Sequence, residues 1–202
     1  MKCAAAVEAI IRHRGRAIVV STMSAIKHVD RLDPEGLNIA CVPLMGGASA
    51  LGLGLALAQP DRPVLVLDGD GSLVMQLGSL VSTAELRPPN FVHFVFNNGV
   101  WFENLANIPI PASGKLDFIT LARAAGNAAV SRFHDAAQLE AAMPELTRPS
   151  GPRFVELIIE PEGSALWSPG NPQAELKDFH FTRMGDEARR MRERLLQAGG
   201  NS

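Results

Sequence analysis

Two short polar stretches of this sequence have the residue types and the placement of a metal-phosphate site. A Gly-Asp-Gly triplet centred on Asp70 comes after the apolar run 64–67, and an asparagine pair ending at Asn98 comes after the apolar run 91–96. Carboxylate and amide oxygens suit a hard cation such as Mg²⁺, which also bridges to phosphate oxygens. The spacing therefore predicts one site built from the ends of two neighbouring strands.

The residues around these stretches add to the expected site. Gly69 and Gly71 carry no side chain, so the backbone can approach a ligand closely. Ser72 is expected to begin a helix, where its hydroxyl can cap the end and free amide groups can face an anion. Gly99 is expected to turn the chain and aim the carbonyl of Val100 inward. Either stretch alone is more often an ordinary turn, but both together favour a site.

Apolar runs and helical patterns alternate along the chain. Strands are expected at 17–21, 38–42, 64–67, 91–96 and 153–159. Helices are expected at 3–13, 46–58, 73–85, 117–125, 135–146 and 182–197. This order predicts an α/β fold, a doubly wound parallel sheet flanked by helices, with ligands beyond the carboxyl ends of the strands.

One domain is expected to take in the whole chain, 1–202, because this length suits a single core and no shift in composition marks a boundary. A Pro- and Gly-rich loop is expected at 164–173, inside a C-terminal helical extension that runs from about 174 to 202. The chain is therefore expected to form one domain that ends in a helical extension.

Composition argues against several classes of protein. The net charge of -2 with interspersed signs offers no surface for nucleic acid. Cys3 and Cys41 stand alone, so zinc, iron-sulfur and disulfide sites are not expected. The expected location is a reducing cytoplasm. The apolar run 44–58 is shorter than the roughly 20 residues of a membrane span, and residues 1–16 suggest an amphipathic helix rather than a signal peptide.

The Asp70 triplet, the 25 residues from Ser72 to Phe96 and the pair ending at Asn98 together resemble the signature of the thiamine-diphosphate enzymes. In that family the aspartate, the second asparagine and the backbone carbonyl two residues beyond it bind magnesium. The resemblance thus implies Asp70, Asn98 and Val100 as metal ligands. It also implies that Gly71 and Ser72 supply backbone or hydroxyl contacts to the diphosphate, and that Gly69 belongs to the cofactor-binding residues.

The upstream run "PLMGGASALGLGLALAQPDRPVLVLDGDGS" resembles the decarboxylase branch of this family. There a bulky apolar residue before a glycine props the cofactor, which implies Met45 before Gly46, and a carbonyl two positions earlier meets the aminopyrimidine, which implies Pro43. Many relatives carry a larger residue at the position of Gly47, and Pro43 is unusual. The resemblance covers about 38–160.

"GDGSLVMQLGSLVSTAEL" is similar to the pattern of sulfopyruvate decarboxylase β subunits and the matching half of phosphonopyruvate decarboxylases. The resemblance implies thiamine diphosphate and Mg²⁺ as cofactors and a small 2-oxoacid as substrate, decarboxylated without oxidation through an ylid and an enamine. Six side chains are candidates for contact with the substrate: Trp101, Glu103 and Asn104 after the metal motif, and the basic residues Lys27, His28 and Arg31. Packing for Trp101 and solvent exposure for Glu103 are equally good explanations, and a scattered basic residue is usually only a surface charge.

In this family a glutamate on a separate pyrimidine-binding domain activates the cofactor. Glu8 and Glu35 are better explained as solvated surface charges, so the catalytic glutamate is expected on a partner chain of similar size. A homodimer or a larger hetero-oligomer would then hold the cofactor at an interface. Two alternatives stay open: a noncatalytic cofactor-binding or regulatory subunit, and a carboligase similar to acetolactate synthase.

Overall fold

A six-stranded parallel sheet forms the centre of the computed structural model, which describes residues 1–101, 107–161 and 179–199. Its strands are β1 (Ile18–Ser21), β2 (Asn38–Ala40), β3 (Val64–Gly69), β4 (Phe91–Asn97), β7 (Ala129–Phe133) and β8 (Arg153–Ile158). They pair in the order β2-β1-β3-β4-β8-β7, every pair parallel. The described residues thus confirm the expected α/β class with a doubly wound sheet.

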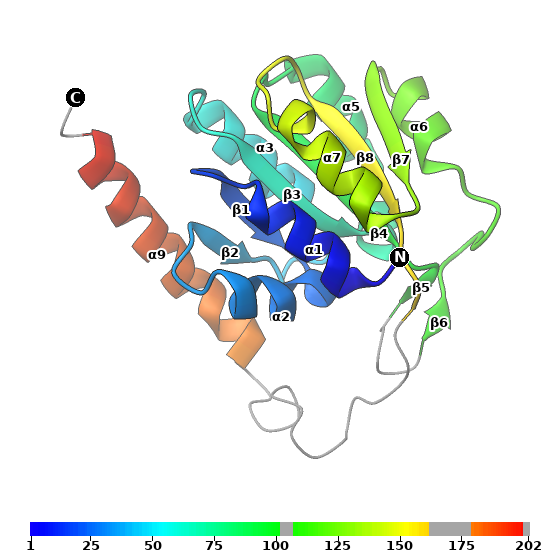
Figure 1. Ribbon diagram of the computed structural model, residues 1–202, viewed down its shortest axis with the longest axis horizontal. Helices are drawn as coiled ribbons and strands as arrows, with labels where there is room; N and C mark the ends of the chain where they lie inside the picture. Colours follow the sequence, from blue (N-terminus) through cyan, green and yellow to red (C-terminus); the bar gives the residue numbers. More distant parts are fainter. Residues whose placement is uncertain (102–106, 162–178, 200–202) are drawn as a thin grey trace.

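Helices cover both faces of this sheet. One face carries α1 (Cys3–Arg12), α2 (Met23–Leu32) and α7 (Ala136–Leu146), and the other carries α3 (Ala48–Ala58), α4 (Asp70–Met75), α5 (Gly78–Leu86) and α6 (Phe118–Ala124). Figure 1 shows α1 and α7 in front of the strands and α3 and α5 behind them. A small antiparallel pair, β5 (Val100–Trp101) and β6 (Ile108–Pro109), follows β4.

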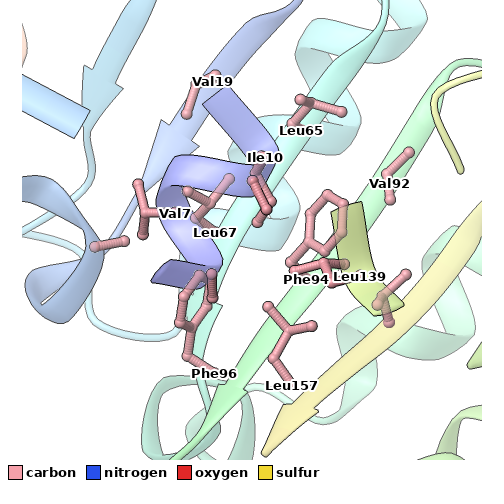
Figure 2. Packing of buried hydrophobic residues seen from close by; sticks show 14 of the residues in the cluster. Val7, Ile10, Val19, Leu65, Leu67, Val92, Phe94, Phe96, Leu139 and Leu157 are labelled. Carbon is pink, nitrogen blue, oxygen red and sulfur yellow. The ribbon is translucent and has the colours of Figure 1, made fainter. Parts of the chain in front are cut away.

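The core between the sheet and the α1 and α7 helices is closely packed. Val7 and Ile10 of α1 and Leu139 of α7 lie over Leu65 and Phe94 of the central strands (Figure 2). All five side chains are fully buried, and each contributes about 1.5–3 kcal/mol by leaving water. β3 is buried along Val64–Asp68 because helices cover both of its faces, as the continuous apolar run predicted.

The winding of the chain reverses between β1 and β3. These two strands are neighbours, but β1 leads outward to β2 through α2, while β3 leads to β4 on the other side through α4 and α5. Such a reversal leaves a crevice at the carboxyl ends of the strands, where α/β proteins bind ligands. The Asp70 triplet and the asparagine pair both follow strands at this edge.

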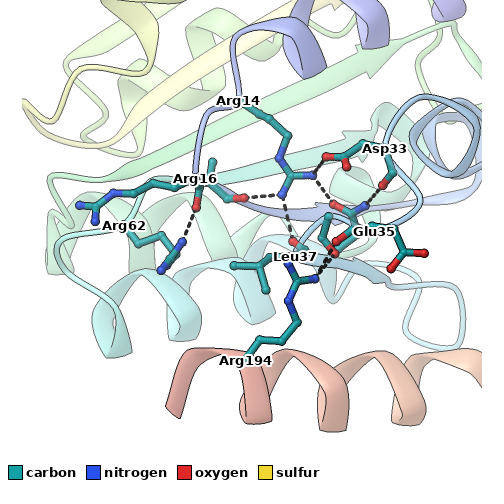
Figure 3. Close-up of polar contacts among 10 residues, drawn as sticks. Arg14, Arg16, Asp33, Glu35, Leu37, Arg62 and Arg194 are labelled. Carbon is teal, nitrogen blue, oxygen red and sulfur yellow. Dashed lines mark hydrogen bonds and ion pairs between the residues drawn. The ribbon is translucent and has the colours of Figure 1, made fainter. Parts of the chain in front are cut away.

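A buried arginine ties the opposite, amino edge together. Arg14 is 8% exposed and donates hydrogen bonds to Asn38 (2.6 Å), Leu37 O (3.3 Å), Asp33 and Ala17 O (Figure 3). Burial lowers the pKa of this guanidinium, and the carboxylate beside it partly offsets that shift. The contacts join the start of β1, the end of α2 and the start of β2, so they fix the edge farthest from the expected site.

The C-terminal helix α9 (Phe179–Gly199) packs along the outer strand β2 (Figure 1). Its Glu187 is 5% exposed, accepts the outward N–H of Ala40 at 2.7 Å and also pairs with Arg183. Arg183 donates two further hydrogen bonds of 2.7 Å to Asp30, and this interaction raises the pKa of its guanidinium. Met191 is buried against the sheet. The helix therefore covers an edge strand that would otherwise expose its backbone.

Most expected elements are present within a few residues of their predicted bounds, and four elements are additional. α2 was not predicted, although half of its ten residues are apolar, and it buries the side chains at 25, 26 and 29. β7 was missed because it is a half-buried edge strand without alternation. The β5–β6 pair is too short to give a periodic signal. The expected loop at 164–173 lies outside the described residues. No helix in the described ranges is long and apolar enough to cross a bilayer.

The expected single helix at 73–85 is wrong. The chain forms α4 up to Met75 and restarts as α5 at Gly78, with Gln76 and Leu77 between the two. Gly78 is a weak helix former at the point of the break. Leu77 and Val81, which the periodicity placed in the buried stripe, are 37% and 57% exposed.

Replacing Glu187 with alanine should lower the free energy of unfolding by about 2 kcal/mol, because the Ala40 N–H loses a charged acceptor and Arg183 loses a partner. Urea denaturation measures this. Glu193→Ala is the matched control, since Glu193 is exposed on the same helix and its loss should change stability by less than about 0.5 kcal/mol. Equal effects of the two substitutions would show that α9 is not held in this way.

Candidate functional site

The Asp70 carboxylate joins the ends of β3 and β4. It is 2% exposed, and its two oxygens accept hydrogen bonds from the backbone N–H of Gly71 (2.7 Å) and of Gly99 (2.6 Å). β3 and β4 pair in parallel with Gly69 opposite Phe96, which brings the triplet and the asparagines to one edge. The structure therefore places together the two stretches that the sequence connected only by spacing.

The turn after β4 is held on both sides. Asn98 Oδ1 accepts the N–H of Val100 at 3.0 Å, and Gly99 has φ +73°, the left-handed conformation that glycine adopts readily. The Gly99 carbonyl accepts hydrogen bonds from Ile110 N (3.1 Å) and Ser113 Oγ (3.0 Å). The turn expected at Gly99 is confirmed, and the segment after β6 fixes it.

The loop before α3 meets the start of α4 at Gly46. Gly46 N donates to Ser72 Oγ at 3.0 Å, and a Cβ at Gly46 would lie 3.3 Å from the Cβ atoms of Met75 and Gln76. The expectation that Ser72 caps the helix is wrong. α4 begins at Asp70, no side chain caps it, and the Ser72 hydroxyl accepts from the neighbouring loop instead.

The remaining upstream candidates lie on the surface of that loop. Pro43 is exposed, and so is Met45, at 43%. Leu44 between them is 52% exposed, and Met75 on the adjoining helix is 54% exposed. A cluster of open apolar side chains therefore adjoins the Gly46–Ser72 contact.

Trp101 packs directly on Gly71. A Cβ at Gly71 would lie 1.9 Å from two atoms of the indole ring, so only glycine fits beside the ring as it lies. The indole Nε1 is buried and has no hydrogen-bond partner among the described residues. Trp101 thus contacts the triplet, whereas Glu103 and Asn104 lie outside the described residues.

The three basic candidates lie on α2, which begins after β1. Lys27 and Arg31 are exposed, and Arg31 is in the last turn of the helix. His28 is half-buried.

A buried carboxylate–imidazole pair lies just inside the sheet edge. Asp68 Oδ1 accepts the N–H of Gly69 (2.9 Å), and Asp68 Oδ2 pairs with His93 Nε2 at 3.1 Å. Both side chains are almost fully buried, and the His93 ring lies edge-on to Phe154. Desolvation, with a smaller effect of Asp68, raises the pKa of the nearby Cys41 thiol to about 11. The pair fixes the residue that precedes Asp70.

A second buried carboxylate, Glu156, supports the other end of the motif. Glu156 is 1% exposed and accepts hydrogen bonds from Asn97 Nδ2 (2.7 Å) and Arg132 Nε (2.6 Å). The hydrogen bond with Glu156 is the largest cause of a raised pKa at Arg132. Sequence reasoning singled out neither this residue nor Asp68. The signal was a charged residue inside an apolar strand, "RFVELII" and "VLVLDG", because a buried charge always needs a partner.

A family model decides what this arrangement is. The model described as thiamine pyrophosphate enzyme, C-terminal TPP binding domain, matches residues 17–157, which include the six strands of the sheet except the last residue of β8. The chain belongs to the thiamine pyrophosphate enzymes. This confirms the family to which the motif pointed.

Relatives of this thiamine pyrophosphate enzyme chain include decarboxylases. It is 36% identical over 148 residues to a phosphonopyruvate decarboxylase of Streptomyces viridochromogenes, a match that covers 73% of this chain and 36% of the relative. It is 54% identical over 54 residues to a sulfopyruvate decarboxylase subunit beta of Methanothermobacter thermautotrophicus, covering 27% of this chain and 29% of the relative. The matched part is thus about a third of each relative's length.

The fold agrees with a solved structure from Mycobacterium smegmatis described as a thiamin diphosphate-dependent enzyme. The TM-score is 0.69 at 21% identity, and the match covers 80% of this chain and 32% of that one. At this identity the comparison shows a shared fold. The architecture expected for a thiamine pyrophosphate enzyme is therefore confirmed.

Gly71→Ala should lower the free energy of unfolding by about 1–3 kcal/mol, because the new methyl group displaces Trp101. In a Trp101→Ala background the same substitution should cost much less, which a double-mutant cycle of urea unfolding measures. Gly78→Ala is the control, since nothing lies within 4 Å of its Cβ position. Equal costs in both backgrounds would mean that the indole does not lie on Gly71.

The Cys41 thiol should be inert in the folded protein. With a pKa of about 11 and a buried side chain, it is roughly one part in a thousand thiolate at pH 8. In a Cys3→Ala variant, a disulfide reagent should react with Cys41 only after urea unfolds the chain. Rapid reaction without urea would contradict the buried, protonated thiol.

Proposed function

We propose that this chain is the diphosphate-binding subunit of a two-subunit, thiamine-diphosphate-dependent 2-oxoacid decarboxylase. One observation carries the proposal: Asp70 Oδ2 accepts the Gly99 N–H at 2.6 Å, so the carboxylate of the triplet and the asparagine turn form one unit. Membership of the thiamine pyrophosphate enzymes supports it.

Asp70, Asn98 and the Val100 carbonyl are the proposed Mg²⁺ ligands. All three supply oxygen, the donor that Mg²⁺ prefers, and phosphate oxygens would complete its coordination. No group of three His, Cys, Asp or Glu side chains forms a metal site within the described ranges. One carboxylate with two neutral oxygen donors suits a cation whose coordination shell is completed by diphosphate oxygens. It suits a cation held by protein ligands alone less well.

The backbone at Gly69, Gly71 and Ser72 is the proposed support of the diphosphate, since it borders Asp70. On the other side of the cofactor, the Pro43 carbonyl, Met45 and Gly46 are proposed to meet its ring system. The Gly46–Ser72 hydrogen bond supports this, because it joins the two groups of residues into one wall.

The division of work between chain and cofactor follows from these contacts. Thiamine diphosphate, when bound, supplies the carbanion and the electron sink needed for the loss of carbon dioxide. The residues of this chain bind the diphosphate and Mg²⁺, and thereby fix the cofactor relative to the substrate. The proposed substrate is a small 2-oxoacid with a second acidic group, sulfonate or phosphonate, in line with the relatives' names.

The activating glutamate is proposed to come from a partner chain of similar size. Relatives named as subunit beta support a division into subunits. In the phosphonopyruvate decarboxylase, about two thirds of the length lies outside the part that matches this chain. The open apolar side chains at Leu44, Met45 and Met75 would then lie next to the partner. By this proposal the isolated chain is inactive.

Isothermal titration calorimetry of thiamine diphosphate, with and without Mg²⁺, tests the proposal. Asp70→Asn keeps an oxygen for the Gly99 N–H but removes the charge, and it should weaken Mg²⁺-dependent binding by at least about tenfold. Asp61→Asn, at an exposed site away from the motif, should bind like the wild type.

The partner chain is then added to the same titration. Tighter binding together with 2-oxoacid decarboxylation would support the two-subunit enzyme. Binding without any turnover in the mixture would favour a noncatalytic cofactor-binding subunit. Binding that ignores Mg²⁺ or Asp70 would overturn the proposed site.

A further inference from the structure

Asn97, the first asparagine of the pair, takes part in a network that the metal ligands do not explain. Its Nδ2 donates to Glu156 Oε1 at 2.7 Å, and the second oxygen of Glu156 accepts from Arg132 Nε at 2.6 Å. Arg132 Nη2 continues to Asp117 Oδ1 at 2.6 Å, and Asp117 is the N-cap of α6. The chain of contacts therefore runs from β4 through β8 and β7 to a helix start.

Sheet register aligns the residues of this network. Across four neighbouring strands Asp68, Val95, Glu156 and Arg132 stand directly opposite one another in a single row. Asn97 follows Val95 by two residues and so lies on the same face of the sheet, one step nearer the edge. Glu156 reaches it diagonally, within the range over which long side chains on one face of a sheet meet.

The network places a fully buried carboxylate where an apolar residue would stabilise the core more simply. Glu156 is 1% exposed, and a buried carboxylate is costly unless it is paired and hydrogen-bonded. Both of its oxygens are used, one by an amide and one by a guanidinium. Such a group specifies geometry more than it adds stability.

The segment that this network holds is the metal-binding turn of the proposed site. Asn97 is bonded to Asn98, and beyond it Gly99 N–H donates to Asp70 while the Gly99 carbonyl accepts from Ile110 and Ser113. The turn is therefore fixed at its far end by backbone contacts. At the near end of the turn, the hydrogen bond from Asn97 to Glu156 is a side-chain contact that ties the turn to β8.

We propose that Asn97 is a positioning residue for Mg²⁺, which acts through the buried Glu156–Arg132 pair to hold Asn98 and Val100 in place for the metal. This inference rests on the proposed function. Asn97 does not touch the ion. Arg132, two strands away, belongs to the same device.

The test measures the Mg²⁺ concentration that half-saturates thiamine diphosphate binding, by calorimetry on the full chain with its partner. Asn97→Ala should raise that concentration about tenfold, in the range found when groups that orient metal ligands are removed. Arg132→Met should raise it as well. Loss of a positive charge near a cation site would by itself strengthen Mg²⁺ binding, so weakening by this variant identifies positioning rather than charge.

Asn90→Ala is the matched control. Asn90 precedes the same strand at its other end, is buried, and donates to three carbonyl oxygens, those of Ala56, Gln59 and Arg62. Its loss should lower the melting temperature without changing the Mg²⁺ requirement. Asn127→Ala, which removes two hydrogen bonds near α6, serves the same purpose if the first control does not fold.

A readout without cofactor separates failure of the inference from failure of the proposed function. Amide hydrogen exchange of Gly99 and Val100 in the unliganded chain should speed up about tenfold in Asn97→Ala and in Arg132→Met. The double variant should show no further increase, because both substitutions break one network.

Faster exchange with a raised Mg²⁺ requirement would support the inference. Unchanged exchange in the variants would overturn it. So would an unchanged Mg²⁺ requirement of the variants, provided that the wild type binds the cofactor. If the wild type binds no thiamine diphosphate, the proposed function fails, and the inference about Mg²⁺ fails with it even where exchange shows that Asn97 holds the turn.

Discussion

Parallel pairing of β3 with β4 in one register is the constraint on which the rest of this structure depends. Gly69 lies opposite Phe96, so Asp70, the first residue after β3, stands at the level of Asn97, the last residue of β4. A slip of one residue would turn every side chain of a strand to the other face. The apolar side chains of β3 and β4 that α1 and α7 cover therefore set the register that also brings a carboxylate to a glycine turn.

The two buried acids show how this edge is stabilised. Asp68 and Glu156 flank Val95 in the same cross-strand row, the first paired with His93 and the second with Arg132. The other oxygen of each acid accepts a hydrogen bond from the residue just before a candidate ligand. Asp68 accepts from the Gly69 N–H, and Glu156 accepts from the Asn97 side-chain amide. Buried charged groups of this kind contribute little net stability but specify one arrangement.

Sequence reasoning could predict the sheet and the motif because both are local signals. Continuous apolar runs gave the central strands, and the family pattern gave Asp70 and Asn98. The prediction of one helix at 73–85 failed because periodicity does not record where a helix stops, and Leu77, although apolar, faces solvent. The role of Ser72 failed for a different reason. Its hydroxyl meets Gly46, a residue 26 positions away, and no local pattern encodes such a contact.

The family match and the folded unit do not have the same boundaries. The match covers 17–157, but α1 and α9 lie outside it and pack against the sheet. Val7 and Ile10 of α1 seal the core over Leu65, and Glu187 of α9 occupies the open hydrogen-bonding edge of β2. A fragment cut at the limits of the shared pattern would expose a slab of aliphatic side chains on one face and a bare strand edge beside it. The span that the family model matches is therefore shorter than the span whose side chains cover this sheet, and a fragment limited to 17–157 would lose that cover on two of its surfaces.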